Sequence, residues 1–211
     1  MSTPVIYTIG HSNHQLEFFL ELLQAFSIDC LVDVRSMPAS AYNPQFNKEV
    51  LSRFLKVNAI EYHHYGKEFG ARHSDPAVLD EEGKVDFRLI RKTTAFHSGM
   101  QRVKQKTGEG KTITLMCSES DPMDCHRFSM ISVALEAAGI EVRHILKDKN
   151  WKSNIALENQ MLKRFGKKIP QPDLFQPNIT IADQLDAAYR LHNKEVAYSP
   201  SAKEPRENEH D

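Results

Sequence analysis

The fold class is decided by residues 4–36, which read PVIYTIGHSNHQLEFFLELLQAFSIDCLVDVRS. A β-rich run ends at Gly10, and a second run of the same kind, CLVDVRS, begins at Cys30. Between His14 and Phe26 the apolar residues recur every three or four positions, which is the period of an amphipathic helix. A strand, a helix and a strand joined by short links form a βαβ unit, so we expect parallel strands with a right-handed crossover.

The alternation of strand and helix patterns continues to the end of the stretch EVRHIL. The runs IEYHHY, TITLMC and EVRHIL are further predicted strands, and a helix through Phe87, Ile90 and Phe96 is predicted to end in the turn-like KTGEGK. Another helix is expected to start with Asp124 as its N-cap and to end at Gly139. Residues 1–148 are therefore predicted to form a Rossmann-like three-layer α/β domain with a mostly parallel sheet.

The pattern changes after Trp151. Two helical stretches, SNIALENQMLKRFG and TIADQLDAAYRLH, flank a proline-rich connector, and Thr180 is the expected N-cap of the second. We expect residues 149–198 to be a C-terminal helical extension packed on the domain. Residues 199–211, which are polar and charged, are predicted to be a disordered tail.

Composition narrows the classes of function. Lys and Arg number 27 against 28 Asp and Glu, so a nucleic-acid partner stays an alternative that the net charge of -1 does not support. No apolar run approaches the roughly 20 residues that span a bilayer, so no membrane association is expected. The chain has three cysteines and starts without a secretion signal, which predicts free thiols in a cytoplasmic protein. The oligomeric state does not follow from composition.

Polar side chains follow three of the predicted strands, where the strands themselves are apolar. In open parallel sheets ligands bind beyond the carboxyl ends of the strands, so these residues are expected to share a pocket. The three groups are Gly10, His11 and Ser12 after the first strand, Asp33, Arg35 and Ser36 at the second, and Cys117, Glu119, Cys125, His126 and Arg127 at and after TITLMC.

Chemical roles follow from residue type. The predicted catalytic residues supply acid–base or nucleophilic groups: His11, Asp33, Glu119 and Cys125. The predicted substrate-binding residues supply cations, hydroxyls or close backbone approach: Gly10, Ser12, Arg35, Ser36, His126 and Arg127. Cys125 at a helix start beside Arg127 indicates a reactive thiolate or an anion site. Three alternatives stay open: a packing role for Cys125, a structural ion pair of Asp33 with Arg35 or Arg127, and a capping role for the residues after Gly10.

Cys117, Cys125 and His126 could also form a metal or thiol-redox module. Their spacing is not the short Cys-x-x-Cys pair of a zinc knuckle, and no second ligand pair is evident. We therefore predict no metal site, and the sequence indicates no particular cofactor. Cys117 and Arg127 lie too far apart for the phosphatase loop, in which five residues separate the cysteine from the arginine.

Five sequence blocks between about Tyr7 and Ile145 together form a recognisable pattern: YTIGHSN, LVDVRSMPAS, NPQFN, YHHYGKEFGAR and LMCSESDPMDCHR. In order and spacing they resemble the family known as domain of unknown function 488. The resemblance implies a Rossmann-like fold and a shared polar pocket, but no settled reaction. Where that family often has a Gly-Gly pair, this chain reads EFGAR. The motif positions map onto all the strand-end residues named above, and onto Pro38.

The expected function is that of an enzyme which binds a small anionic or nucleotide-like substrate at the carboxyl ends of the parallel strands. The alternatives are a nucleic-acid-associated protein and the metal or thiol-redox module of Cys117, Cys125 and His126.

Overall fold

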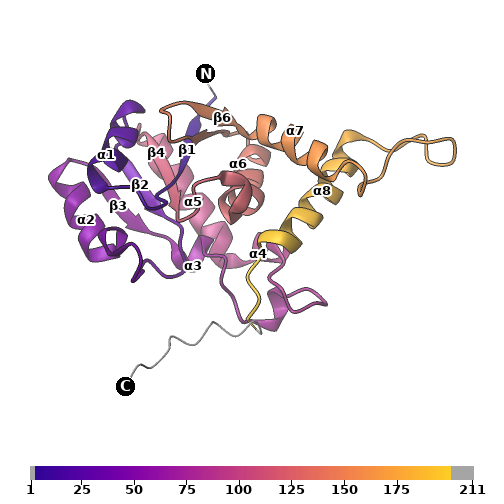
Figure 1. The fold of residues 1–211 in the computed structure, drawn as a ribbon, viewed down its shortest axis with the longest axis horizontal. Helices are drawn as coiled ribbons and strands as arrows, with labels where there is room; N and C mark the ends of the chain where they lie inside the picture. The colour runs from indigo at the N-terminus through magenta and orange to yellow at the C-terminus, as the bar shows by residue number, and fades with distance from the viewer. Residues whose placement is uncertain (1–2, 201–211) are drawn as a thin grey trace.

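The computed structural model describes residues 3–200 and places a six-stranded sheet among the helices (Figure 1). The strand order is β3-β2-β4-β1-β5-β6, in which β6 runs antiparallel to β5 and every other neighbouring pair is parallel. The predicted α/β class with a mostly parallel sheet is confirmed. The strands are β1 (Val5–Gly10), β2 (Cys30–Asp33), β3 (Glu61–His64), β4 (Ile113–Cys117), β5 (Glu141–Ile145) and β6 (Trp151–Ser153).

Helices cover both faces of the sheet. Two pack on one face: α1 (Leu16–Ala25) and α2 (Lys48–Val57). Four pack on the other: α3 (Gly66–Phe69), α4 (Phe87–Ile90), α5 (Thr94–Gly108) and α6 (Val133–Ala137). The short helices are the 3-10 turns η1 (Pro44–Phe46), η2 (Pro76–Val78) and η3 (Pro122–Asp124), and the π-helix η4 (Arg127–Ser132), which leads into α6.

The two faces are built by alternation along the strands. Leu31 and Met116 lie in the core under α1 and α2, whereas Val32 and Leu115 lie in the core under α3–α6. Successive side chains of a strand point to opposite faces, so strands that are apolar throughout are buried on both sides. Each face therefore has its own apolar core and its own set of covering helices.

One detail of the mid-chain region differs from the expectation. The helix predicted to run from Phe87 to KTGEGK is two helices, because α4 ends at Ile90 and the hydroxyl of Thr93 accepts the N–H of Phe96 to cap α5. The polar stretch that follows β3 begins with the one-turn helix α3, and an isolated bridge joins Leu79 to Val85 further along it.

The C-terminal part begins with β6, which the sequence did not indicate, and continues with α7 (Asn154–Phe165) and α8 (Ile181–Val196). A third core joins these helices to the rest, with Met123 and Phe128 packed against Leu157 and Met161. Thr180 forms the predicted cap of α8, in a reciprocal capping box with Asp183. The loop between α7 and α8 projects from the body (Figure 1).

The predicted tail over 199–211 lies outside the described residues from residue 201 onward. Among the residues that the structure describes, no helix is both long and apolar enough to cross a membrane.

The register of the strands brings their carboxyl ends to one level. Gly10 of β1 lies opposite Cys117 of β4, and Asp33 of β2 lies between Met116 and His64. Backbone bonds extend this alignment past the strands, since His11 N–H donates to the carbonyl of Cys117 at 2.9 Å. The residues that follow β1, β2 and β4 therefore meet at one edge of the sheet.

Candidate functional site at the carboxyl edge of the sheet

The first group at this edge is a closed polar network that we call the His11–Arg35 network; it consists of His11, Asp33, Arg35 and Tyr62. The Arg35 guanidinium donates to both carboxylate oxygens of Asp33, at 2.9 and 2.6 Å, and the Tyr62 hydroxyl donates to the same carboxylate at 2.7 Å. A further guanidinium nitrogen lies 3.0 Å from Nε2 of His11. Asp33 is fully buried and Arg35 is 5% exposed, so this ion pair is shielded from solvent.

His11 is held on three sides. Its Nδ1 donates to the carbonyl of Ser12 at 2.7 Å, its Nε2 faces Arg35, and its ring stacks on Phe46 with centroids 4.3 Å apart. Burial, and then the positive charge of Arg35, lower the pKa of His11 to about 4. The imidazole is therefore neutral near pH 7, with both nitrogens bonded within the protein.

Arg35 and Tyr62 are held in the same way. Burial disfavours the charged guanidinium, but its bond to Asp33 outweighs this and raises the pKa of Arg35. Burial and the Asp33 charge raise the pKa of the Tyr62 phenol, so it stays a donor. Arg35 also donates to the carbonyl of Phe46 at 2.8 Å. Phe46 and Tyr62 are not among the site residues predicted from the sequence.

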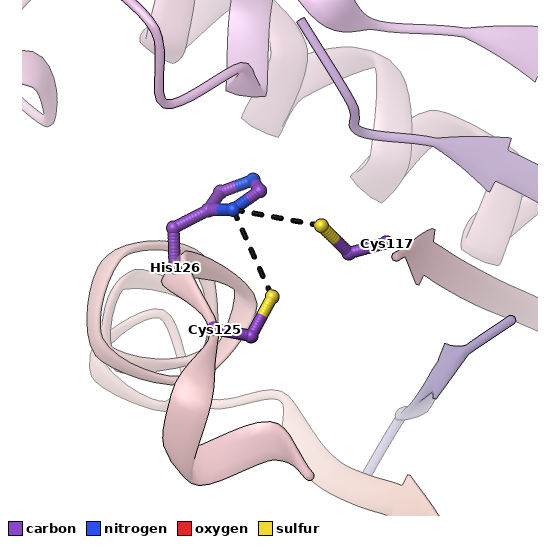
Figure 2. Close-up of side chains that lie close together, drawn as sticks. All are labelled: Cys117, Cys125 and His126. Atoms are coloured by element: carbon purple, nitrogen blue, oxygen red, sulfur yellow. Dashed lines mark hydrogen bonds between the residues drawn. The ribbon is translucent and has the colours of Figure 1, made fainter. Parts of the chain in front are cut away.

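The second group, on the other face of the same edge, is a cluster that we call the thiol cluster; it consists of Cys117, Glu119, Cys125 and His126. Nδ1 of His126 lies 3.6 Å from the sulfur of Cys117 and 3.7 Å from that of Cys125 (Figure 2). The thiol of Cys117 donates to the Glu119 carboxylate at 3.0 Å. Figure 2 shows Cys117 reaching in from the end of its strand, and Cys125 and His126 from the start of the helical segment.

The local backbone explains how Cys125 turns inward. The prediction of Asp124 as helix N-cap is wrong, because residues up to Asp124 form the turn η3, which Asp121 caps by accepting the N–H of Met123. Cys125 then has an extended backbone, with φ -136° and ψ 142°, just before the helical segment. Its sulfur accepts the N–H of Arg127 at 3.4 Å. The sulfur thus takes the position that a capping oxygen usually holds.

Electrostatics divide the two thiols. Burial disfavours the thiolate of Cys125, but the hydrogen bond from Cys117 and the charge of Arg127 lower its pKa well below the usual range. Burial and the bond to Cys125 raise the pKa of Cys117 well above its usual range. Burial and the Cys125 charge raise the pKa of Glu119. The two pKa shifts therefore favour the thiolate at Cys125 and the neutral thiol at Cys117.

Arg127 anchors the loop that carries the cluster. Its side chain is fully buried, and its terminal nitrogens donate to the carbonyls of Glu119 and Ser120 at 2.7 and 3.0 Å. Within the described residues, its Nε and the Nε2 of His126 are buried without a hydrogen-bond partner. The positive charge of Arg127 therefore acts on the thiol cluster, while its N–H groups hold the backbone of the loop.

The remaining predicted residues have structural contacts. A side chain at Gly10 would place its Cβ 1.7 Å from the carbonyl oxygen of Glu119, so only glycine permits this close approach. Ser12 has a left-handed backbone with φ 49° and donates to Asn13 at 3.4 Å. Ser36 accepts the N–H of Arg72 at 2.9 Å. These contacts position the loops around the two groups.

A cavity of about 450 Å³ borders the loop that carries the thiol cluster. It lies between that loop, from Ser120 to Asp124, and the connection from β5 to β6. Its lining includes Lys147 and Lys152, which have no ion-pair partner among the described residues. Nothing in the sequence pattern had indicated either lysine.

The structure thus brings the predicted residues to one edge but into two groups. His11, Asp33 and Arg35 form one group, whereas Glu119, Cys125 and His126 join Cys117 in the other. Gly10 and Arg127 lie where the groups meet, since both approach the carbonyl of Glu119.

Comparison with known proteins yields one match. A family model described as "Domain of unknown function DUF488" matches residues 15–134, which is more than half of the chain. No curated protein and no solved structure gives a significant match.

Proposed function

Since the chain belongs to the DUF488 family, whose description names no activity, we propose a function from the site alone: an enzyme that acts on a small anionic, nucleotide-like substrate. The observation that carries the proposal is the thiol cluster, in which Cys117 contacts both Glu119 and His126, and His126 also contacts Cys125. Clusters of such groups at the carboxyl ends of parallel strands are typical of active sites.

Glu119 is the proposed acid–base group. Glu119 is exposed, whereas the other three residues of the thiol cluster are buried. Its carboxylate accepts a hydrogen bond from the thiol of Cys117. Cys125 and His126 lie behind it, buried and fixed by the helical segment. In this proposal His11 and Asp33 are positioning residues, because their polar atoms are bonded within the His11–Arg35 network.

The cavity that borders the loop from Ser120 to Asp124 is the proposed substrate site. Its volume of about 450 Å³ is within the range of small-molecule sites, roughly 300–1,000 Å³. Lys147 and Lys152 would hold the anionic group of the substrate, a role that the sequence had suggested for Arg35 and Arg127. Both arginines already donate to protein acceptors, so the lysines are the better candidates.

Nucleic acid is a weaker candidate partner. Three aspartates, Asp121, Asp124 and Asp148, also line the cavity, so its rim does not form the basic stripe that phosphate backbones require. A cytoplasmic location is part of the proposal, because the three free thiols would stay reduced there.

A ligand screen tests this function. The melting temperature of the purified protein is measured with each of a panel of nucleotides, sugar phosphates and carboxylates. Any compound that raises the melting temperature is then titrated by calorimetry. We expect Lys147→Gln combined with Lys152→Gln to weaken binding at least tenfold. Lys149→Gln is the matched control, because Lys149 lies on the same connection but pairs with Glu21. A hit that binds the double variant as tightly as the parent, or a panel without any hit, would contradict the proposal.

A further inference from the structure

The thiol cluster has the geometry of a metal site. In tetrahedral zinc sites the metal lies about 2.3 Å from sulfur and about 2.0–2.1 Å from nitrogen, which separates the two ligand atoms by about 3.6 Å. The distances from His126 Nδ1 to the sulfurs of Cys117 and Cys125 are 3.6 and 3.7 Å. All three ligand atoms lie within 4.8 Å of one another. The two distances from nitrogen to sulfur therefore match those around a single tetrahedral ion.

From this geometry we infer that Cys117, Cys125 and His126 bind one divalent ion of the zinc type, with Glu119 beside its fourth position. The inference assigns a cofactor to the site of the proposed function, and rests on that function only for the role of Glu119. Two sulfurs and an imidazole select zinc among the common divalent ions, whereas magnesium and calcium prefer oxygen.

Regular backbone structure holds the ligands. Cys117 ends the buried strand β4, and Cys125 and His126 lie between η3 and η4, with His126 at the N-cap of η4. Backbone hydrogen bonds fix the carbonyls of Cys117 and Cys125. The ligands are 3%, 1% and 8% exposed, respectively. The sequence gap from Cys117 to Cys125 is longer than in a zinc knuckle because a strand end and a helix start, joined by a loop, take the place of a tight turn.

Formal charge supports a dication here. Arg127 is fully buried and bonds carbonyl oxygens, so its charge needs negative groups nearby. With both thiols ionised and Glu119 as a carboxylate, the ion and Arg127 together cancel the negative charges. The N–H of Arg127 that reaches the sulfur of Cys125 is a contact of the kind that orients metal-bound ligands.

Three protein ligands leave a fourth position open, as in catalytic rather than structural zinc sites. The carboxylate of Glu119 lies 3.0 Å from the sulfur of Cys117, so it would lie next to an ion held by that sulfur. A bound water or a substrate oxygen there would lie within reach of Glu119. The site would then hold a Lewis acid and an acid–base group together.

A second group of metal-type ligands, Cys30, Glu61 and His63, is a poor alternative. Glu61 is already bonded by Lys106, Lys111 and His63. Burial raises the pKa of Cys30 to about 11, which opposes the thiolate that a metal needs. The Cys30→Ser variant is therefore a matched control for the thiol cluster.

Cobalt titration tests the inference. Full-length protein is treated with a chelator, kept reduced, and titrated with Co²⁺ while absorption is recorded. We expect one ion per chain, thiolate-to-cobalt charge transfer and the visible bands of tetrahedral cobalt. Cys117→Ser, Cys125→Ser and His126→Asn should lose these signals, and Cys30→Ser should keep them. Circular dichroism identifies any variant that fails to fold. If a variant fails to fold, the parent protein is alkylated with and without Zn²⁺ instead. We then expect Zn²⁺ to protect two of its three thiols.

Glu119→Gln is expected to weaken Co²⁺ binding about 10–100-fold, as loss of outer contacts does at metal sites. Asp124→Asn, a carboxylate on the same loop, should leave binding unchanged. The inference would be overturned if the parent protein showed no charge-transfer absorption with Co²⁺. It would also be overturned if only the Cys30→Ser variant lost that absorption. A Cys117–Cys125 disulfide in protein that binds no metal would overturn it as well, since it would assign the pair to dithiol chemistry. Metal binding without a hit in the ligand screen would sustain this inference and contradict the proposed function; a hit without metal would do the reverse.

Discussion

The two polar groups at the carboxyl edge of the sheet differ in how fully they are satisfied. In the His11–Arg35 network, each polar group has a protein partner, from the Asp33 carboxylate to the Tyr62 hydroxyl. In the thiol cluster the contacts of His126 with the sulfurs are long, at 3.6 and 3.7 Å, and its Nε2 has no partner among the residues described. The His11–Arg35 network therefore has the features of a structural hydrogen-bond network. The thiol cluster still has ligand atoms that could bind another group.

The comparison teaches that charge and burial alone do not identify a functional residue. Arg35 and Cys125 are both buried at the same edge of the sheet, but the guanidinium of Arg35 already donates hydrogen bonds to protein acceptors. A residue that can act on a ligand must keep an atom free for it. We therefore expect substitutions in the network to affect mainly stability, and those in the thiol cluster to affect mainly binding.

The largest effect is expected from Asp33→Asn. It leaves the buried Arg35 guanidinium without its carboxylate, and loss of one partner of a buried ion pair costs about 3–5 kcal/mol. Urea unfolding at pH 7 measures the loss. Glu141→Gln is the control, because the half-exposed pair of Glu141 with Arg143 contributes about 1 kcal/mol or less. Equal losses in the two variants would remove the distinction between a buried brace and a surface pair.

Gly10→Ala should break the contact where the two groups meet. Its Cβ would lie 1.7 Å from the backbone oxygen of Glu119, and overpacking of this kind costs about 1–3 kcal/mol. Because the displaced loop carries Glu119, Co²⁺ affinity should fall as well. Gly108→Ala is the control at the end of α5, where an added Cβ meets nothing within 4 Å. A Gly10→Ala protein with unchanged stability and Co²⁺ affinity would show that the loop does not depend on this approach.

Acid should weaken the fold through buried neutral histidines. Burial, together with Arg35 and Arg127 respectively, lowers the pKa of His11 to about 4 and that of His144 to about 3. The unfolded chain binds protons at both below about pH 6.5, whereas the folded chain does not. The free energy of unfolding should therefore fall by about 2 kcal/mol for each histidine between pH 7 and pH 5.

Urea unfolding at both pH values, on the parent and on His144→Gln, separates the two contributions. The variant should lose about half of the pH dependence that these histidines cause, and the remaining half belongs to His11 in the network. His97→Gln, on the exposed side of α5, should behave as the parent does. An unchanged pH dependence in His144→Gln would mean that other groups cause the acid sensitivity.

The smallest effect on stability is expected from Glu119→Gln. In the part of the chain that the structure describes, its carboxylate accepts one side-chain hydrogen bond, from Cys117, and exposed substitutions usually change stability by about 0.5 kcal/mol or less. The same variant should lose ligand or metal affinity, so stability and binding should separate. If Glu119→Gln unfolds as easily as Asp33→Asn, the thiol cluster is a structural brace like its neighbour.

Most of the buried elements, and the edge of the sheet at which the polar residues gather, could be predicted from the sequence. Apolar runs and helical periods predicted the buried strands β1, β2 and β4 and the helix α1, because burial on two faces leaves a direct imprint on composition. Thr180 and Gly139 marked helix ends by local chemistry, and both act as expected. The strand β6 was not predicted, because it has only three residues, two of them exposed, and so lacks an apolar pattern.

Which polar side chains form hydrogen bonds and ion pairs with one another could be seen only in the tertiary structure. The strand order places β4 between β1 and β2, so the side chains of His11 and Arg35 meet across the end of a strand distant in sequence. The extended backbone at Cys125 turns its sulfur toward Cys117, which sequence spacing could not show. Pairing depends on the directions of side chains from elements brought together by the core, and those directions arise from packing rather than from the order of residues.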